Sequence, residues 1–276
     1  SHVAFMSHEH ADVLKLKTIA NEFNNVDVKT IPENYMSQTF GDTYFSYDDC
    51  KKIGYIRDRI EEYKNSNMIN DRERAILITS LLYSMDKIAN TCGHYDAFIK
   101  GAHFDKQFDY KLIKITNDFN NSARFYRGDA NKIIKETDFP VVDCVYCDPP
   151  YNSRQYSRFY HAMETIVKWD KPELIGVARK PKEENMSDYC RSGAPVVFKD
   201  LVDNLNVKYI IVTYNNTYNS KSSSSKNKIT LEQIIEILKN RGTVKVFEHK
   251  HNAFNAGKTN LKDHKEFLFV CEVANG

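Results

Sequence analysis

The stretch VVDCVYCDPPY, residues 141–151, decides the fold of this chain. Valine, cysteine and tyrosine dominate residues 141–147, a composition that predicts a fully buried strand within a sheet. Pro149 and Pro150 cannot donate to a sheet ladder, so the strand must end before them. The carboxylate of Asp148 is therefore expected at the carboxyl end of a strand, where open α/β sheets place their ligands.

The residues that follow this strand suit the recognition of a planar base with an exocyclic amine. A proline carbonyl is an acceptor without an N–H beside it, and Asp148 adds a carboxylate acceptor. Two acceptors match the two N–H bonds of an NH2 group, and the ring of Tyr151 offers a flat surface to the base. The structural alternative is a buried strand that simply ends in a proline turn.

The run Asp148-Pro149-Pro150-Tyr151 resembles the DPPY motif of methyltransferases that modify N6 of adenine in DNA. The longer run 148–181, with NSRQY at 152–156 and KWD at 168–170, is similar to D12-class enzymes near the FokI type. The four-residue motif is only moderately specific, because N4-cytosine enzymes use a related one. The extended run is much more specific to the D12 class.

The resemblance implies an α/β fold, with the mixed sheet and flanking helices of a Rossmann-like class I methyltransferase core. It implies S-adenosyl-L-methionine as the cofactor, no metal, and double-stranded DNA as the substrate in a restriction-modification system. The target adenine would be flipped out of the duplex. Asp148 and the Pro149 carbonyl would accept the N6 hydrogens, Pro150 would stiffen the turn, and Tyr151 would stack on the base.

A second acid follows a second expected strand. Residues 123–127 are expected to form this strand, and Gly128-Asp129 comes directly after it. This turn resembles the family motif whose acid binds the amine of the cofactor's adenine, so Asp129 joins Asp148 as a predicted cofactor-binding residue. The alternative role for Asp129 is that of a helix N-cap.

Two segments at the same edge of the sheet are predicted to contact nucleic acid. Basic and aromatic residues interleave after the motif, a pattern that suits a gripped backbone beside a flipped base, and they include Arg154, Tyr156 and Arg158. A further buried strand at 207–213 ends in Tyr214 and Asn215. These two residues resemble the later family motif that lines the target pocket.

The sequence departs from the family in one respect. Such enzymes carry a Gly-rich FxGxG-like loop after their first strand, and the ten glycines printed here are dispersed. We therefore expect a core that lacks its first strand or strands and a companion polypeptide that supplies the Gly-rich cofactor motif. The alternatives are an N4-cytosine or RNA amino-methyltransferase, or a non-catalytic DNA-binding subunit.

Composition and periodicity predict the remaining organisation. The 276 residues carry a net charge of +2, no apolar run approaches the roughly 20 residues of a membrane span, and six scattered cysteines favour a reducing cytoplasm. A mainly helical region, which could include target-recognition elements, is expected at 1–120 and the catalytic core at 121–276. The expected helices include 48–64, 70–88, 195–205 and 230–239, and the expected closing strands are 243–249 and 267–273.

Overall fold

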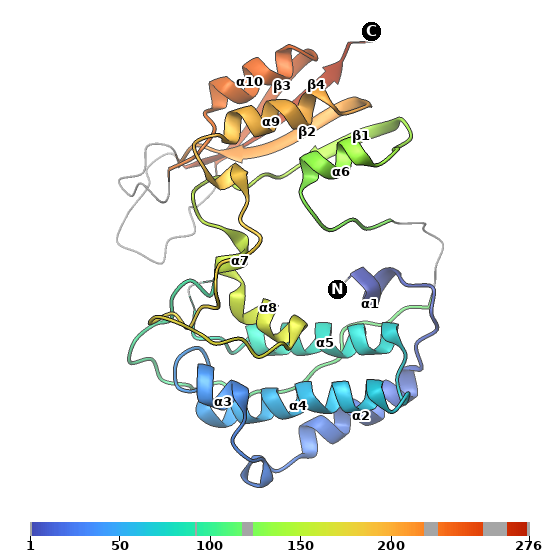
Figure 1. Cartoon of the computed structure of the whole chain (residues 1–276), viewed down its shortest axis with the longest axis vertical. Coiled ribbons are helices and arrows are strands. Elements are labelled where there is room, and N and C mark those ends of the chain that lie inside the picture. Colours follow the sequence, from blue (N-terminus) through green and yellow to red (C-terminus); the bar gives the residue numbers. More distant parts are fainter. Residues whose placement is uncertain (1, 92, 118–123, 218–225, 251–263, 275–276) are drawn as a thin grey trace. The chain divides into compact units, whose positions relative to one another are not determined.

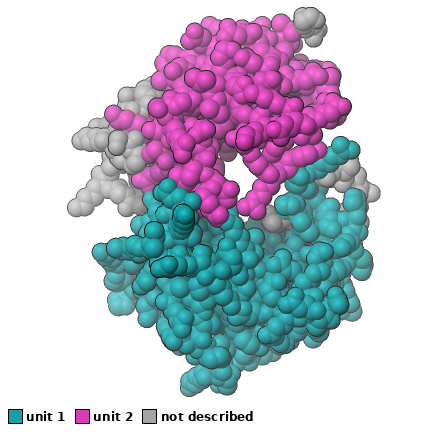
Figure 2. Space-filling view, in the orientation of Figure 1, with its two compact units in different colours: residues 1–125, 158–183 teal, residues 126–157, 184–276 magenta. Residues whose placement is uncertain are grey.

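The computed structural model describes residues 2–91, 93–117, 124–217, 226–250 and 264–274. The chain forms two compact units, each built from two segments (Figure 2). Residues 1–125 and 158–183 form the first, here called the helical unit, and residues 126–157 and 184–276 form the second, the sheet unit. The segment 158–183 thus belongs with the helices although it follows the DPPY motif in the chain.

The helical unit has its core along two adjacent helices, α4 and α5 (Figure 1). Apolar side chains recur at helical spacing on both, and five of the core residues among them are at most 1% exposed: Ile53, Ile56, Ile60, Ile76 and Leu77. The helices expected at 48–64 and 70–88 are therefore confirmed. The elements of this unit are α1 (His2–Met6), α2 (Val13–Asn25), η1 (Val28–Thr30), α3 (Tyr35–Phe40), α4 (Tyr47–Asn65), α5 (Asp71–Asp86) and α8 (His161–Lys168). The short α7 (Tyr156–Phe159) straddles the boundary between the units.

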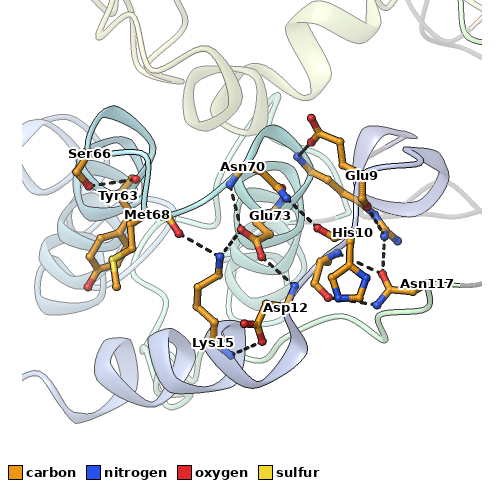
Figure 3. Close-up of polar contacts among 12 residues, drawn as sticks. Glu9, His10, Asp12, Lys15, Tyr63, Ser66, Met68, Asn70, Glu73 and Asn117 are labelled. Carbon is orange, nitrogen blue, oxygen red and sulfur yellow. Dashed lines mark hydrogen bonds and ion pairs between the residues drawn. The ribbon is translucent and has the colours of Figure 1, made fainter.

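A buried carboxylate joins the start of α5 to the start of α2 (Figure 3). Glu73 is 1% exposed, and its Oε2 accepts hydrogen bonds from Asn70 N at 3.0 Å and from Lys15 Nζ at 2.7 Å. Its Oε1 accepts from Asp12 N at 2.9 Å. Asn70 in turn accepts from Glu73 N, which completes a capping box. Burial alone would raise the pKa of Glu73, but these hydrogen bonds outweigh it and leave the pKa below its ordinary value.

The sheet unit contains a four-stranded mixed sheet in the order β1-β2-β4-β3. Its strands are β1 (Val142–Cys147), β2 (Val207–Asn215), β3 (Gly242–Lys250) and β4 (Lys265–Val273), and its helices are α6 (Ala130–Glu136), η2 (Asp188–Cys190), α9 (Ala194–Asp203) and α10 (Leu231–Lys239). β1 and β2 are parallel, whereas β4 runs antiparallel to both β2 and β3. The expected mixed sheet with flanking helices is confirmed, and so is the helix expected at 230–239, for which Thr230 is the N-cap.

Helices α9 and α10 lie over one face of this sheet (Figure 1). Alternate strand residues point into the core beneath them, and the fully buried ones include Ile210, Val212, Phe269 and Cys271. The intervening strand residues point to the opposite face, which we call the open face, and its apolar members are Cys144, Tyr146, Tyr209, Ile211, Phe247, Leu268 and Val270. Tyr146 is 61% exposed and Phe247 is 55% exposed, so no described residue covers these side chains fully.

Two strand predictions need correction. β1 was expected to be fully buried, but Val142 and Tyr146 are exposed and Cys147 is the strand's buried residue. The reason is that β1 pairs with β2 alone among the described strands and so forms an edge. The strand expected at 123–127 is absent over the described residues 124–127, where Phe125 and Tyr126 are exposed and no neighbouring strand supplies a ladder. Within the described residues, no helix combines the length and the apolar character needed to cross a membrane.

We expect Glu73→Gln to lower the free energy of unfolding at pH 7 by about 1–3 kcal/mol, because a buried charge-assisted network loses its charge. The folded-state pKa of Glu73 is depressed, so its contribution is present above the unfolded pKa of about 4.3 and is lost as pH falls through the folded value. The difference between wild type and variant should therefore shrink in acid. Urea unfolding, monitored by far-ultraviolet circular dichroism at several pH values, measures this difference in the free energy of unfolding.

The matched control is Glu236→Gln, which changes an exposed glutamate of α10 for which the structure shows no side-chain hydrogen bond. Its free energy of unfolding should stay close to that of wild type at every pH. A pH-independent difference for Glu73→Gln would show that the charge of Glu73 is not what stabilises this junction.

Candidate active site

The DPPY residues begin directly where β1 ends, at Cys147. Because β1 and β2 are parallel, their carboxyl ends lie at the same edge of the sheet, and the pairing of Cys147 with Val212 brings the next residues, Asp148 and Thr213, side by side. Asp148 is exposed, as a ligand-binding carboxylate must be, whereas Pro149 is buried. The sequence-based placement of Asp148 at a strand end is confirmed by this geometry.

Hydroxyl groups converge on one oxygen of the Asp148 carboxylate. Tyr151 Oη and Thr213 Oγ1 each donate to Asp148 Oδ1, both at 3.1 Å. Tyr146 Oη lies 3.0 Å from Thr213 Oγ1. A threonine hydroxyl has a single proton, and Thr213 donates it to Asp148, so Tyr146 must be the donor to Thr213. The described residues provide no hydrogen bond to Asp148 Oδ2, which remains available to a ligand.

The hydroxyl of Tyr151 is held in its protonated form. Burial, and then the nearby charge of Asp148, raises the pKa of Tyr151 well above its ordinary value. At neutral pH this hydroxyl is therefore a donor to Asp148 rather than a competing anion. The half-buried ring lies edge-on to the ring of Tyr214, with 4.9 Å between the ring centroids.

Tyr214 has a structural role in the observed geometry. Its side chain is fully buried, its hydroxyl donates to the Tyr151 carbonyl at 2.9 Å, and the same hydroxyl accepts from Ile229 N at 3.2 Å. Lys228 N donates to the same Tyr151 carbonyl at 2.8 Å. The backbone of Tyr151 is thus fixed from two sides. A contact between Tyr214 and nucleic acid remains a prediction.

Asn215 is 7% exposed and organises the turn after β2. Its Oδ1 accepts from Thr217 Oγ1 at 2.8 Å, and its carbonyl accepts from the side-chain amide of Asn227. The first of these bonds uses the oxygen of the side-chain amide with which Asn215 was expected to meet a base. Its predicted contact with nucleic acid is therefore not visible in this arrangement and stays a prediction.

The basic and aromatic run after the motif is divided between the two units. Arg154 and Tyr156 belong to the sheet unit, as does Asp148; Arg154 is half-buried and Tyr156 is 52% exposed. Arg158 belongs to the helical unit and donates a hydrogen bond to the Pro181 carbonyl at 2.6 Å. Arg154 and Tyr156 lie in the segment that directly follows the DPPY motif. Their contacts with DNA, and that of Arg158, remain predictions.

Sequence reasoning missed Gln155, which lies within this run and is 6% exposed. Its side-chain amide forms two hydrogen bonds with the backbone of Ser187: Nε2 donates to the carbonyl at 2.9 Å, and Oε1 accepts from the N–H at 2.6 Å. This pair of bonds fastens the chain after the motif to the start of η2. No local pattern could have indicated it, because the partner lies 32 residues away.

Asp129 acts as a helix cap in the structure. Its Oδ1 accepts from Lys132 N at 3.0 Å at the start of α6, while its side chain remains exposed and the described residues give Oδ2 no partner. Capping and ligand binding use different oxygens and are compatible. The cofactor role of Asp129 therefore stays a prediction.

The cysteine pair at the end of β1 does not form a metal site. Cys144 is exposed and Cys147 is buried, as expected for an odd spacing on a strand, and burial raises the pKa of the Cys147 thiol to about 11. Among the residues that the structure describes, no group of three or more histidine, cysteine or acidic side chains could hold a metal ion.

Comparison with known proteins identifies the family. Residues 13–220 match the model of the D12 class N6 adenine-specific DNA methyltransferases. Relatives include the modification methylase StsI of Streptococcus sanguinis, 38% identical over 63% of this chain and 26% of its own length, and the type II methyltransferase M.FokI of Planomicrobium okeanokoites, 32% identical over 83% and 35%. The type II methyltransferase M.NlaIII of Neisseria lactamica is 32% identical over 83% of this chain and 67% of its own length.

The chain thus spans about a quarter to a third of the length of the StsI and FokI enzymes. No solved structure matches it significantly. The family match covers the helical unit from α2 onward, the DPPY segment and β2, so it includes every residue of the hydroxyl network around Asp148. The chain belongs to the D12 class of N6 adenine-specific DNA methyltransferases.

Proposed function

We propose that this chain positions adenine N6 in DNA for methyl transfer from S-adenosyl-L-methionine, as part of a restriction-modification system. The observation that carries the proposal is the Asp148 carboxylate, exposed at a strand end with Oδ1 saturated by two hydroxyls and Oδ2 unbonded by the described residues. Oδ2 and the Pro149 carbonyl would accept the two N6 hydrogens. The nitrogen lone pair would then point away from both acceptors, toward the methyl donor.

The chemistry needs placement more than proton transfer. Bound S-adenosyl-L-methionine would supply a methyl group on a sulfonium, which is already a good leaving group. The exposed carboxylate of Asp129 fits an adenine amine, because its Oδ2 is free of bonds from the described residues. The contribution of this chain is to orient the target amine, and alignment of that kind accounts for much of the acceleration in bound reactions.

The target base must leave the duplex, because its N6 amine is paired and stacked there. The ring of Tyr151 would then stack against the flipped adenine, and the exposed Tyr156 with the neighbouring Arg154 would contact the strand beside it. Product analysis of the methylated base separates this proposal from an N4-cytosine or RNA amino-methyltransferase. A complex that binds DNA without modifying any base would instead be a DNA-binding subunit.

We further propose that a companion polypeptide carrying the Gly-rich cofactor loop docks on the open face and on the unpaired edge of β1. The printed sequence has no such loop, and the StsI and FokI relatives extend well beyond the matched region. The edge of β1 bears exposed Val142 and Tyr146, and an uncovered apolar edge and face are features that proteins normally bury. The companion would add a parallel strand and an apolar helix.

Asp148→Ala is expected to abolish methyl transfer while leaving the fold intact. An N–H left without an acceptor in a desolvated site costs about 1–3 kcal/mol before any loss of alignment. Incorporation of labelled methyl groups into DNA by the complex measures the effect. Asp203→Ala is the control, because Asp203 is an exposed residue of α9 whose partner is Lys199 on the surface. Near wild-type incorporation by Asp148→Ala would refute the mechanism.

Tyr151→Ala should reduce catalysis more than it weakens binding to duplex DNA. Stacking of a base on an aromatic ring contributes about 1–3 kcal/mol and is gained only after flipping. Tyr151→Phe keeps the ring and removes the hydroxyl bond to Asp148, so it should retain most of the activity that Tyr151→Ala loses. Turnover rates and filter-binding affinities for the same DNA distinguish the two effects. Equal damage by both variants would assign the main role to the hydroxyl.

The isolated chain should bind S-adenosyl-L-methionine poorly and methylate DNA weakly or not at all. Isothermal titration with and without the companion, a polypeptide from an adjacent reading frame that carries an FxGxG-like motif, measures the difference. Tyr209→Glu on the open face should abolish docking, whereas Val196→Glu, which alters a 73% exposed side chain of α9, should not. Micromolar cofactor binding with full activity by the isolated chain would contradict the proposal.

A further inference from the structure

We infer that Thr213 is a positioning residue for methyl transfer and that Tyr146 acts through it. The inference rests on the proposed function and adds two residues that face Asp148 from the open face. Thr213 belongs to β2 and Tyr146 to β1, and the two side chains meet because Tyr146 pairs with Ile211, two residues before Thr213 in the parallel register. Their hydroxyl oxygens are 3.0 Å apart.

The direction of the hydrogen bonds gives Thr213 its role. A rotating carboxylate can present either oxygen to a ligand, and two equivalent oxygens would allow several orientations of the amine. Thr213 Oγ1 and Tyr151 Oη both donate to Oδ1 at 3.1 Å, so rotation of the Asp148 side chain would break two bonds at once. Oδ2 is thereby the oxygen left for the amine. Thr213 would never touch the base; it would fix the group that does.

Tyr146 fixes the Thr213 hydroxyl in turn. The Thr213 hydroxyl already donates to Asp148, and the bond that it accepts from Tyr146 Oη is a second restraint on its orientation. If stacking on a base turned the Tyr151 ring, its bond to Asp148 would break. Thr213 would then be the one donor among those described that keeps Oδ1 occupied, so its contribution would be largest in the substrate complex.

Tyr146 lies on the open face, so docking of the companion polypeptide would affect the hydrogen bonds that link Tyr146, Thr213 and Asp148. The side chain is 61% exposed on the open face, so in the isolated chain water competes for its hydroxyl. A companion that covers this face would exclude that water, and hydrogen bonds strengthen in a region of lower dielectric constant. The same contact that completes the sheet would therefore also secure the orientation of Asp148.

The test compares four variants in the complex with the companion polypeptide. Thr213→Val removes the hydroxyl at nearly constant shape and should lower kcat by about tenfold. KM for DNA and Kd for the cofactor should remain within about twofold, because Thr213 contacts neither ligand. Thr213→Ser keeps the hydroxyl and should retain most of kcat. Tyr146→Phe should lower kcat by about threefold.

The double variant Tyr146→Phe/Thr213→Val tests whether Tyr146 acts on Asp148 through Thr213. If Tyr146 acts through Thr213, the double variant should be no slower than Thr213→Val alone, since coupled residues give non-additive effects. Thr137→Val is the control: it alters a half-buried threonine at the end of α6, away from the open face, for which the structure shows no side-chain hydrogen bond, and kcat should not change.

Three results would overturn the inference while leaving the proposed function intact: wild-type kcat for Thr213→Val, equal loss with Thr213→Ser, or multiplied effects in the double variant. The second result would mean that packing of the methyl group matters rather than the hydroxyl. Absence of methyl transfer by the wild-type complex would instead refute the proposed function, and this inference with it.

Discussion

The parallel pairing of β1 with β2 is the constraint on which the site depends. Parallel strands end at the same edge of a sheet, so the turn after β1 and the last residues of β2 are brought together although 65 residues separate Asp148 from Thr213. An antiparallel partner would have placed its amino end there. The hydroxyl network around Asp148 and the fixed backbone of Tyr151 both follow from this one pairing.

The same strand explains why the sheet unit is open. β1 has the composition of a central strand, with valines, cysteines and a tyrosine on both faces, yet its far edge has no neighbour among the described residues. The covered face of the sheet is packed by α9 and α10, and the open face retains large exposed side chains. This composition in an edge position is the observation behind our proposal that further polypeptide completes the sheet. The family membership and the longer relatives are consistent with that reading.

The features that could be predicted from the sequence are those with local causes. Two prolines fix the end of β1, apolar spacing identifies α4 and α5, and Thr230 caps α10 within a single turn. The features that could not be predicted depend on distant partners. The exposure of β1 depends on which strands lie beside it, and the bonds from Gln155 to Ser187 depend on the path of the chain between them. The bond from the Tyr214 hydroxyl to the Tyr151 carbonyl could not be predicted either, because the position of Tyr214 at a strand end does not show where its hydroxyl points.

The polarity of the hydrogen-bonding groups around Asp148 supports our proposal that the site takes an amine. Pro149 and Pro150 remove two N–H donors from the turn, so its backbone presents carbonyl acceptors. The hydroxyl donors nearby, on Thr213 and Tyr151, are directed to Asp148 Oδ1 and are not available to a ligand. A carbonyl oxygen of a base would therefore meet acceptors and be repelled, whereas an NH2 group finds an unbonded carboxylate oxygen beside a proline carbonyl. In the proposed function, discrimination between amino and keto bases would thus follow from the direction of these hydroxyl donors, before the shape of the base is considered.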